Sequence, residues 1–253
     1  MALELLVLTV DDALFQRDDL HEERLGGAVQ ECTSGTDDLH SGAAVSADAG
    51  SYNQLRHNAR SAKGELARSH FDSLLRAYEN AYVAACSERR LHIREQALAV
   101  MDGAERNGVR LALASTLSSR MVCALMESAI GRDWADQFAV VATADALSDQ
   151  DTEAELYHLI LRTAAVPAHR ALLVTATERS LEAAQGIGMH SICLSARGDS
   201  LTGASGACIS HPDNNGMPLR GSDVLEMLAE ITQASRATPV PFRASYATAT
   251  AVG

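Results

Sequence analysis

Polar side chains that can do chemistry follow directly after three apolar runs of this sequence. The runs, with the residues that follow them, are 3–10 with Asp11 and Asp12, 109–114 with Ser115 and Thr116, and 171–174 with Thr175. A short continuous apolar run of this kind is typical of a buried strand in a parallel sheet. A carboxylate or hydroxyl at the end of such a strand can bind a cation or another ligand, or it can cap the next helix.

These polar residues have structural interpretations beside the functional ones. Asp11 is either part of a site or the cap of the next helix, and Ser115 is either a ligand-binding hydroxyl or the N-cap of a helix over residues 119–130. His21 either lines a cleft or lies on the surface. The acidic residues around it are expected to form the solvated face of a helix.

Strands and helices are expected to alternate along most of the chain. The expected strands span residues 3–10, 109–114, 138–142, 171–174 and 190–195, and the expected helices span 97–107, 119–130, 153–164, 178–187 and 223–233. This alternation predicts βαβ units and a parallel sheet. Gly108 and Gly188 are expected to end two of the helices.

An inserted segment interrupts the alternation directly after the first strand. Residues 15–31 and 52–90 are helical in composition, whereas residues 32–51 are rich in Ser, Gly, Thr and Asp and are expected to form a loop. The expected parts of the chain are an α/β core of residues 1–14 and 92–233, a helical cap of residues 15–91 and a disordered tail of residues 234–253.

The composition limits the class of protein. The chain has 253 residues, of which 47% are hydrophobic and 4% aromatic, and this suits helices packed on a sheet. The net charge of −12 argues against nucleic acid or an anionic membrane as a partner, because both attract a basic surface. No apolar run is long enough to span a bilayer, and no signal peptide is expected.

Cysteine and histidine usage argues against a metal site of the zinc type. The five cysteines are scattered without a C-x-x-C pair, which is typical of reduced thiols, so we expect a cytoplasmic protein. The nine histidines include no H-E-x-x-H motif. No zinc-binding residues are therefore predicted.

Two stretches resemble motifs of a known superfamily. Residues 107–116 are similar to the second motif of the haloacid-dehalogenase superfamily, and residues 171–189 are similar to its fourth. The resemblance is to the branch that holds β-phosphoglucomutase, phosphoglycolate phosphatase and xylulose bisphosphate phosphatase. It covers nearly the whole chain, and it implies a Rossmann-like parallel core with a helical cap inserted after the first strand.

The first motif departs from the pattern of that superfamily. The family sequence is Asp-x-Asp-Gly-Thr-Leu, and residues 9–14 stand in its place. The resemblance puts Thr9 at the position of the aspartate nucleophile and Asp11 at that of the general acid/base. A carboxylate is already ionised at neutral pH, whereas a threonine hydroxyl must first lose a proton. Asp12 replaces a glycine and adds negative charge where a phosphate is expected.

Most of the other motifs also lack the charged residues of the family pattern. Ser115 stands where a hydroxyl holds a phosphate oxygen in the family. Asp151 takes the place of the motif-three lysine, and Thr175 with Ala176 takes the place of the acidic pair that holds Mg²⁺. In the cap, residues 49–51 stand near the position of a Gly-Gly-Lys substrate loop. We therefore expect no bound Mg²⁺ and no other cofactor.

Three functions are compatible with these substitutions. The first is a catalytically inactive phosphatase-like protein that binds a small ligand or a protein partner. The second is a hydrolase with altered chemistry, in which Asp11 activates Thr9, because residues i and i+2 of a strand point the same way. The third is a structural subunit beside an active paralogue. The residues expected to line the ligand cleft are Asp11, Asp12, Ser115, Thr116 and His21.

Overall fold

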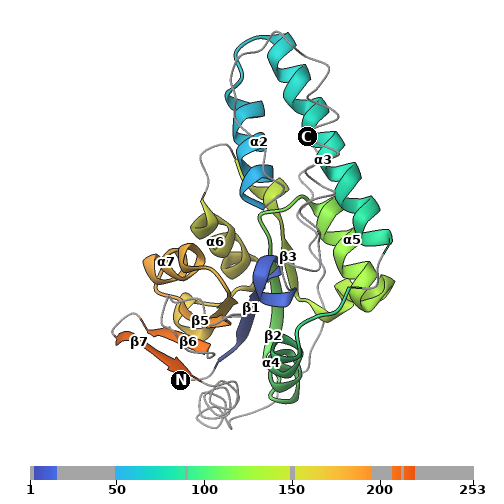
Figure 1. Ribbon diagram of the computed structural model, residues 1–253. Coiled ribbons are helices and arrows are strands. Elements are labelled where there is room, and N and C mark those ends of the chain that lie inside the picture. Colours follow the sequence, from blue (N-terminus) through green and yellow to red (C-terminus); the bar gives the residue numbers. More distant parts are fainter. Residues whose placement is uncertain are drawn as a thin grey trace.

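The core of the protein is a seven-stranded sheet with the strand order β3-β2-β1-β4-β5-β6-β7 (Figure 1). The computed structural model describes residues 3–15, 49–88, 91–148, 152–194, 207–211 and 214–219. The strands are β1 (Leu5–Thr9), β2 (Arg110–Ala114), β3 (Val140–Ala142), β4 (Ala171–Thr175), β5 (His190–Leu194), β6 (Ala207–His211) and β7 (Asn214–Leu219). Strands β1 to β5 pair in parallel, which confirms the predicted parallel α/β fold.

Four helices cover the two faces of the parallel part of the sheet. They are α4 (Glu95–Arg106), α5 (Ser119–Ile130), α6 (Glu153–Ala164) and α7 (Glu178–Gly186). The limits of α5 and α6 agree with the prediction to the residue, and those of α4 and α7 differ from it by one or two residues. Helix ends are less strongly determined by apolar spacing than helix middles, because the last turn carries few packing residues.

Strand β1 is apolar because both of its faces are covered. Leu6 and Leu8 belong to the cluster that includes buried residues of α4 and α5. Leu5 and Val7 belong to the cluster that includes buried residues of α6 and α7. A central parallel strand buries side chains on both faces, so its sequence shows a continuous apolar run rather than alternation. This burial fixes the register of β1, which places Thr9 where the carboxyl ends of the parallel strands lie.

The predicted glycine stops of α4 and α7 are confirmed. Gly108 has φ 70° and Gly188 has φ 74°, values that side-chain-bearing residues rarely adopt. The N–H of Gly108 donates to the Glu105 carbonyl at 3.0 Å, and the N–H of Gly188 donates to the Gln185 carbonyl at 2.9 Å. Both glycines thus reverse the chain directly into a strand of the sheet.

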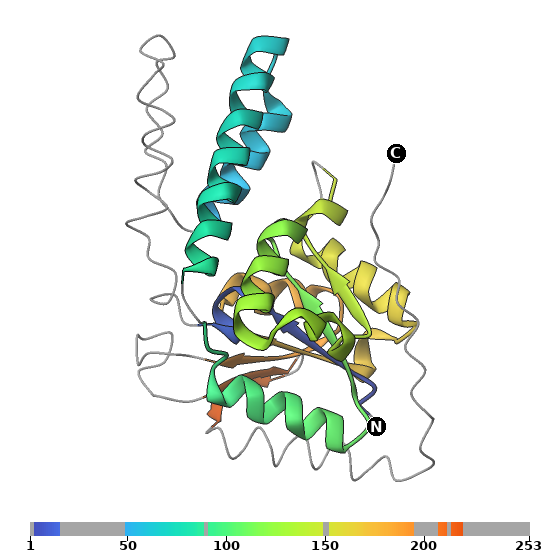
Figure 2. The same ribbon diagram turned by 90° about the vertical axis from the view of Figure 1, so that its right-hand side faces the viewer.

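Helices α2 (Ala49–Ser61) and α3 (Glu65–Ser87) lie between β1 and α4 in the chain. The sequence predicted one helical stretch over 52–90 after a loop that ended at residue 51. The structure corrects the first limit, because residues 49–51 belong to α2, and it divides the stretch in two, because residues 62–64 separate α2 from α3. The two views show α2 and α3 beyond the carboxyl end of β1 (Figures 1 and 2).

The chain leaves and re-enters the core at one place. The Arg94 N–H, just before α4, donates to the Leu14 carbonyl oxygen at 2.8 Å. The two ends of the segment between them therefore lie side by side, as an inserted unit requires. The exact limits of the predicted cap, residues 15–91, stay a prediction.

An antiparallel hairpin, β6 with β7, extends the sheet beyond β5. The sequence analysis assigned no element to these residues. The helix predicted over 15–31, the helix predicted over 223–233 and the disordered tail predicted over 234–253 lie outside the described residues. Among the residues that are described, no helix is both long enough and apolar enough to cross a membrane.

Candidate functional site

The carboxyl ends of β2, β1 and β4 meet at one edge of the sheet, on the side of α2 and α3 (Figure 1). Thr9 is the last residue of β1, and its partner across the sheet in β2 is Ala114. After Thr9 the chain forms η1 (Val10–Leu14), a single π-helical turn. Isolated turns of this type are rare and are found frequently at functional sites. The candidate site therefore includes Thr9, the residue that precedes this turn.

Thr9 contacts Thr175, the last residue of β4. The Thr9 hydroxyl donates to Thr175 Oγ1 at 3.2 Å and lies 3.4 Å from the Val174 carbonyl oxygen. Thr9 is 7% exposed and Thr175 is fully buried. A hydroxyl becomes a nucleophile when a base takes its proton, and neither a second hydroxyl nor a peptide carbonyl is such a base. These contacts hold Thr9 in place without activating it.

Ser115 lies one residue beyond β2 and is buried. Its hydroxyl oxygen accepts from the Leu117 N–H at 3.1 Å, and its own N–H donates to the Ala142 carbonyl at 3.0 Å. The N-cap of α5 is Ser118, whose Oγ accepts from the Met121 N–H. The interpretation of Ser115 as the cap of α5 is therefore wrong, because the turn after β2 brings Ser118 to that position. Its ligand-binding role stays a prediction.

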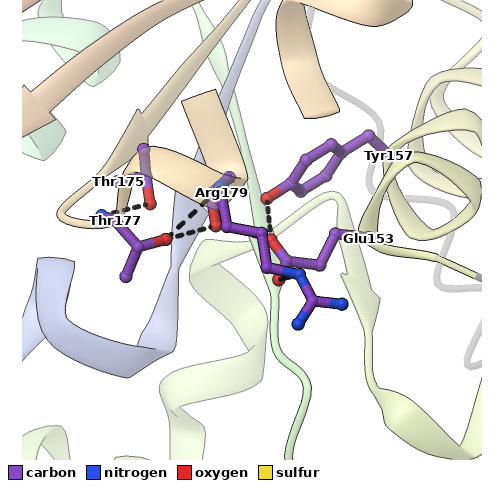
Figure 3. Close-up of polar contacts among 6 residues, drawn as sticks. Glu153, Tyr157, Thr175, Thr177 and Arg179 are labelled. Atoms are coloured by element: carbon purple, nitrogen blue, oxygen red, sulfur yellow. Dashed lines mark hydrogen bonds and ion pairs between the residues drawn. The ribbon is translucent and has the colours of Figure 1, made fainter. Parts of the chain in front are cut away.

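Glu153, in the first turn of α6, is the centre of a polar network that the sequence analysis did not identify (Figure 3). Its carboxylate accepts from Ser180 Oγ at 2.6 Å and from the Tyr157 hydroxyl at 3.3 Å, and it pairs with Arg179 Nε at 3.3 Å. The Glu153 side chain is only 14% exposed. Tyr157 follows Glu153 at the i, i+4 spacing, so that pair was visible in the sequence. The contacts of Glu153 with residues of α7 were not visible in the sequence.

Thr177 joins the Glu153 network to the end of β4. As the N-cap of α7, its Oγ1 accepts from the Ser180 N–H at 3.3 Å and lies 2.8 Å from Ser180 Oγ, to which it donates. The Thr177 N–H donates to Thr175 Oγ1 at 3.3 Å (Figure 3). A series of hydrogen bonds thus links Thr9 through Thr175 and Thr177 to the carboxylate of Glu153. These polar groups satisfy one another inside the fold.

The structure describes some of the remaining predicted site residues in full, some by their backbone alone and some not at all. Thr116 and Ala176 are partly buried and follow the ends of β2 and β4. The backbones of Asp11 and Asp12 lie inside η1. Residues 16–31 of the helix that Asp11 was expected to cap lie outside the described residues, so that interpretation stays a prediction. The side chains of both aspartates lie outside the description. The predicted site residues that are themselves outside the described ranges are His21 and Asp151.

The described side chains at this edge do not fit Mg²⁺. Thr9 and Thr175 supply neutral hydroxyls that bond to each other, and Ala176 supplies no side-chain oxygen. Magnesium prefers an octahedral shell of oxygen ligands that includes carboxylates. Within the part of the chain that the structure describes, no group of three or more His, Cys, Asp or Glu side chains is placed to hold a metal ion.

We expect a calorimetric titration of this protein with millimolar MgCl₂ to give no heat beyond that of dilution. The physical reason is that a hard divalent cation gains little from neutral hydroxyls compared with its own hydration shell. The same titration of protein dialysed against a chelator serves as the control. A crystal grown with MgCl₂ that shows an octahedral ion touching Asp11 would contradict this prediction.

A curated relative covers half of the chain. The chain is 31% identical over 138 residues to the protein CbbY of Cereibacter sphaeroides. The match covers 54% of this chain and 58% of that protein, so it spans somewhat more than half the length of the relative. No protein-family model matches the chain.

Solved structures match a larger part of the chain than this relative does. A CbbY variant from Rhodobacter sphaeroides, crystallised with xylulose-(1,5)bisphosphate, superposes with a TM-score of 0.60 and 25% sequence identity, over 80% of this chain and 92% of that one. The chain has the haloacid-dehalogenase-like fold. A haloacid-dehalogenase-like hydrolase from Xanthomonas campestris shares the fold over 93% of this chain and 94% of its own, with a TM-score of 0.53 and 15% identity. The similarity to the haloacid-dehalogenase-like superfamily that the sequence motifs predicted is thereby confirmed.

Proposed function

We propose that this protein, which has the haloacid-dehalogenase-like fold, binds a ligand at the carboxyl edge of its sheet and does not hydrolyse phosphate esters. The observation that carries the proposal is the 3.2 Å contact between the Thr9 and Thr175 hydroxyls. By the resemblance, these two residues occupy the places of the nucleophile and of a metal ligand. Both positions hold neutral hydroxyl groups, which are hydrogen-bonded to each other.

Phosphoryl transfer depends on positioning and on the neutralisation of charge. The resemblance assigns that work to a carboxylate nucleophile, a metal ion and a lysine, and this chain has Thr9, the pair Thr175 and Ala176, and Asp151 in their places. The loss of one charge-stabilising contact commonly lowers a rate by about a hundredfold or more. Several such losses act on one step here, although their effects do not simply add.

The occupant that suits these residues is a neutral or cationic small molecule or a protein segment. Asp12 and Asp151 replace a neutral glycine and a cationic lysine of the family pattern. A sugar bisphosphate, such as the xylulose-(1,5)bisphosphate crystallised with CbbY, would meet this added negative charge. The net charge of −12 argues in the same direction against an anionic ligand, nucleic acid or membrane.

A hydrolase that uses Thr9 as its nucleophile is the competing function. In the sequence, the argument for this hydrolase is that Asp11 lies two residues after Thr9 on the same predicted strand. In the structure β1 ends at Thr9, and Asp11 lies in the π-helical turn η1, so the rule for alternate strand residues does not relate the two. The Thr9 hydroxyl also donates to Thr175. These observations favour the binding function.

The deciding experiment is hydrolysis of a panel of sugar phosphates with Mg²⁺ by highly purified protein, run beside Thr9→Ala. We expect phosphate release from both proteins to equal the rate without protein, because neither contains a ready nucleophile. Thermal-shift measurements on the same samples show whether both are folded. Robust turnover that Thr9→Ala abolishes would overturn the proposal in favour of the Thr9 hydrolase.

A further inference from the structure

Two cysteines take directly opposite positions in the antiparallel part of the sheet. Strands β5 and β6 pair over four consecutive residues, and Cys193 of β5 is the register partner of Cys208 in β6 (Figure 1). Directly opposite residues of an antiparallel pair share one face of the sheet and are close cross-strand neighbours. The register therefore makes a pair of two cysteines that the sequence shows without a C-x-x-C motif.

The backbone spacing of such a pair suits a disulfide. Opposite residues in an antiparallel ladder have Cα atoms about 4.5 or about 5.5 Å apart, according to whether the two residues exchange hydrogen bonds. A disulfide spans Cα separations of about 4.4 to 6.8 Å, so either kind of pair can be bridged. The Cβ atoms must approach each other by roughly 1 Å from their usual cross-strand distance. A small movement of β6 toward β5 is enough.

The position of the pair in its strands favours that movement. Leu194 ends β5 and Ala207 begins β6, so the pair lies one residue from the end of the ladder. The ends of a ladder open more readily than its middle. On its other side, Cys208 pairs with Pro218 of β7, which has no N–H to donate. Strand β7 therefore restrains β6 less at Cys208 than a residue with an N–H would.

The other member of the pair belongs to the firmly packed part of the sheet. Cys193 is the register partner of Thr175, the last residue of β4. Thr175 is fully buried and accepts the Thr9 hydroxyl, and Ile192 is also fully buried. A bond between the two cysteines would thus fasten β6 to a strand that is fixed in the core, beside the strand ends of the candidate site.

The two other cysteines that the structure describes lie in helices. Cys86 is in α3 and Cys123 is in α5. Burial raises the pKa of the Cys86 thiol to about 12, and burial followed by the charge of Glu127 raises the pKa of Cys123. Thiol–disulfide exchange proceeds through the thiolate, so both shifts slow it at neutral pH. We therefore expect the opposed cysteines of β5 and β6 to bond to each other in preference to these two.

We propose that Cys193 and Cys208 form a reversible redox site, a dithiol that a low-molecular-weight disulfide such as oxidised glutathione converts into a cross-strand disulfide. One cysteine thiolate attacks a sulfur atom of oxidised glutathione, forms a mixed disulfide and releases a glutathione thiolate. The other cysteine thiolate attacks the protein sulfur of that mixed disulfide and releases the second glutathione thiolate. Two cysteine thiols are oxidised, one glutathione disulfide is reduced, and the two cysteine protons pass to glutathione. The site does not depend on the ligand binding proposed above.

Peptide mapping of the full chain without reductant tests the site. Folded protein is treated with oxidised glutathione, its remaining thiols are blocked, and trypsin then cuts at Arg197, between the two cysteines. We expect the peptides of residues 180–197 and 198–220 to be joined, with a mass two hydrogen atoms below their sum, and to separate in dithiothreitol. Hydrogen exchange at residues 207–211 is expected to be on the order of tenfold slower in the oxidised protein, because the cross-link opposes separation of β6 from β5.

Single variants distinguish the proposed pair from unselective oxidation. In Cys193→Ser and in Cys208→Ser we expect the remaining cysteine of the pair to keep one bound glutathione, because no second thiol releases it. Cys123→Ser is the matched control and is expected to form the link as wild type does. Thermal-shift measurements show that each variant is folded.

Three results would overturn the proposal. The first is the absence of the link at every ratio of oxidised to reduced glutathione. The second is the same distribution of links among the cysteines in folded protein and in concentrated urea, where the ladder no longer holds the two thiols opposite each other. The third is a linked protein in which exchange at residues 207–211 is unchanged.

Discussion

Replacement of Thr9 by aspartate is expected to lower the free energy of unfolding by about 3 kcal/mol at pH 7, because it moves a charge from water into a buried position beside a carbonyl oxygen. Thr9 is 7% exposed, and its oxygen lies near the Val174 carbonyl and the Thr175 hydroxyl. A carboxylate there faces a carbonyl oxygen that repels it. We therefore expect a carboxylate to fit this position poorly.

The dependence of this loss on pH identifies its cause. Burial raises the pKa of a carboxyl group, so the folded form of the variant binds its proton more tightly than the unfolded form. The penalty is therefore present in full above the folded pKa and disappears as the pH falls below the unfolded value of about 3.9. Urea unfolding of Thr9→Asp and Thr9→Asn should differ strongly at pH 7 and little near pH 4. An equal difference at both pH values would contradict the prediction.

Magnesium is not expected to restore the stability of Thr9→Asp. Thr175 and Ala176 still supply no carboxylate on the neighbouring strand, so one added aspartate does not complete an octahedral shell. If millimolar MgCl₂ returns the urea midpoint of the variant to that of wild type, the statement that this edge does not fit a metal is wrong.

Replacement of Glu153 by alanine is expected to lower the free energy of unfolding by about 3 kcal/mol, because buried donors lose their acceptor. Tyr157 is 1% exposed and Ser180 is 6% exposed, and both donate to Glu153. The partner Arg179 is 77% exposed, so its ion pair contributes little. Most of the loss is therefore the cost of two buried hydroxyls left without this acceptor.

Glu155→Ala is the matched control for Glu153→Ala. Both glutamates lie in the first turn of α6, where a negative charge favours the helix by about 0.3 to 1 kcal/mol, but Glu155 is exposed. Urea unfolding at neutral pH should therefore show a small loss for Glu155→Ala and a loss several times larger for Glu153→Ala. Equal losses would mean that the charge on the helix end, and not the network, accounts for the role of Glu153.

The hydrogen-bond network around Glu153 reaches the proposed ligand site at the end of β4. Thr175 receives the Thr9 hydroxyl on one side and the Thr177 N–H on the other. In the family pattern this strand end carries metal ligands that face the substrate. Here its hydroxyl is fully buried and serves to join β1, β4 and α7. The contacts of Thr175 thus stabilise the fold at the strand end where the resemblance places a metal ligand.

The sequence by itself determined the haloacid-dehalogenase-like fold and the parallel order of elements, and it placed Thr9, Thr175 and Ala176 at the ends of strands. The strands and the helices α5 and α6 were predictable because apolar spacing is a local property of the chain. Gly108 and Gly188 were predictable as helix stops for the same reason, since a positive φ is a requirement on one residue. The hairpin β6–β7 and the break between α2 and α3 were not predicted.

Only the tertiary structure decided which polar groups meet. Thr9 and Thr175 are 166 residues apart in the chain, and their hydrogen bond exists because β1 and β4 are neighbours in the sheet. The contacts of Glu153 depend on the packing of α6 against α7, and the hydrogen bond from Arg56 to the Ala144 carbonyl oxygen depends on the position of α2 beside the turn after β3. Hydrogen bonds require a match of distance and angle between particular atoms. Apolar periodicity specifies which face of an element is buried, but not which atoms meet across it.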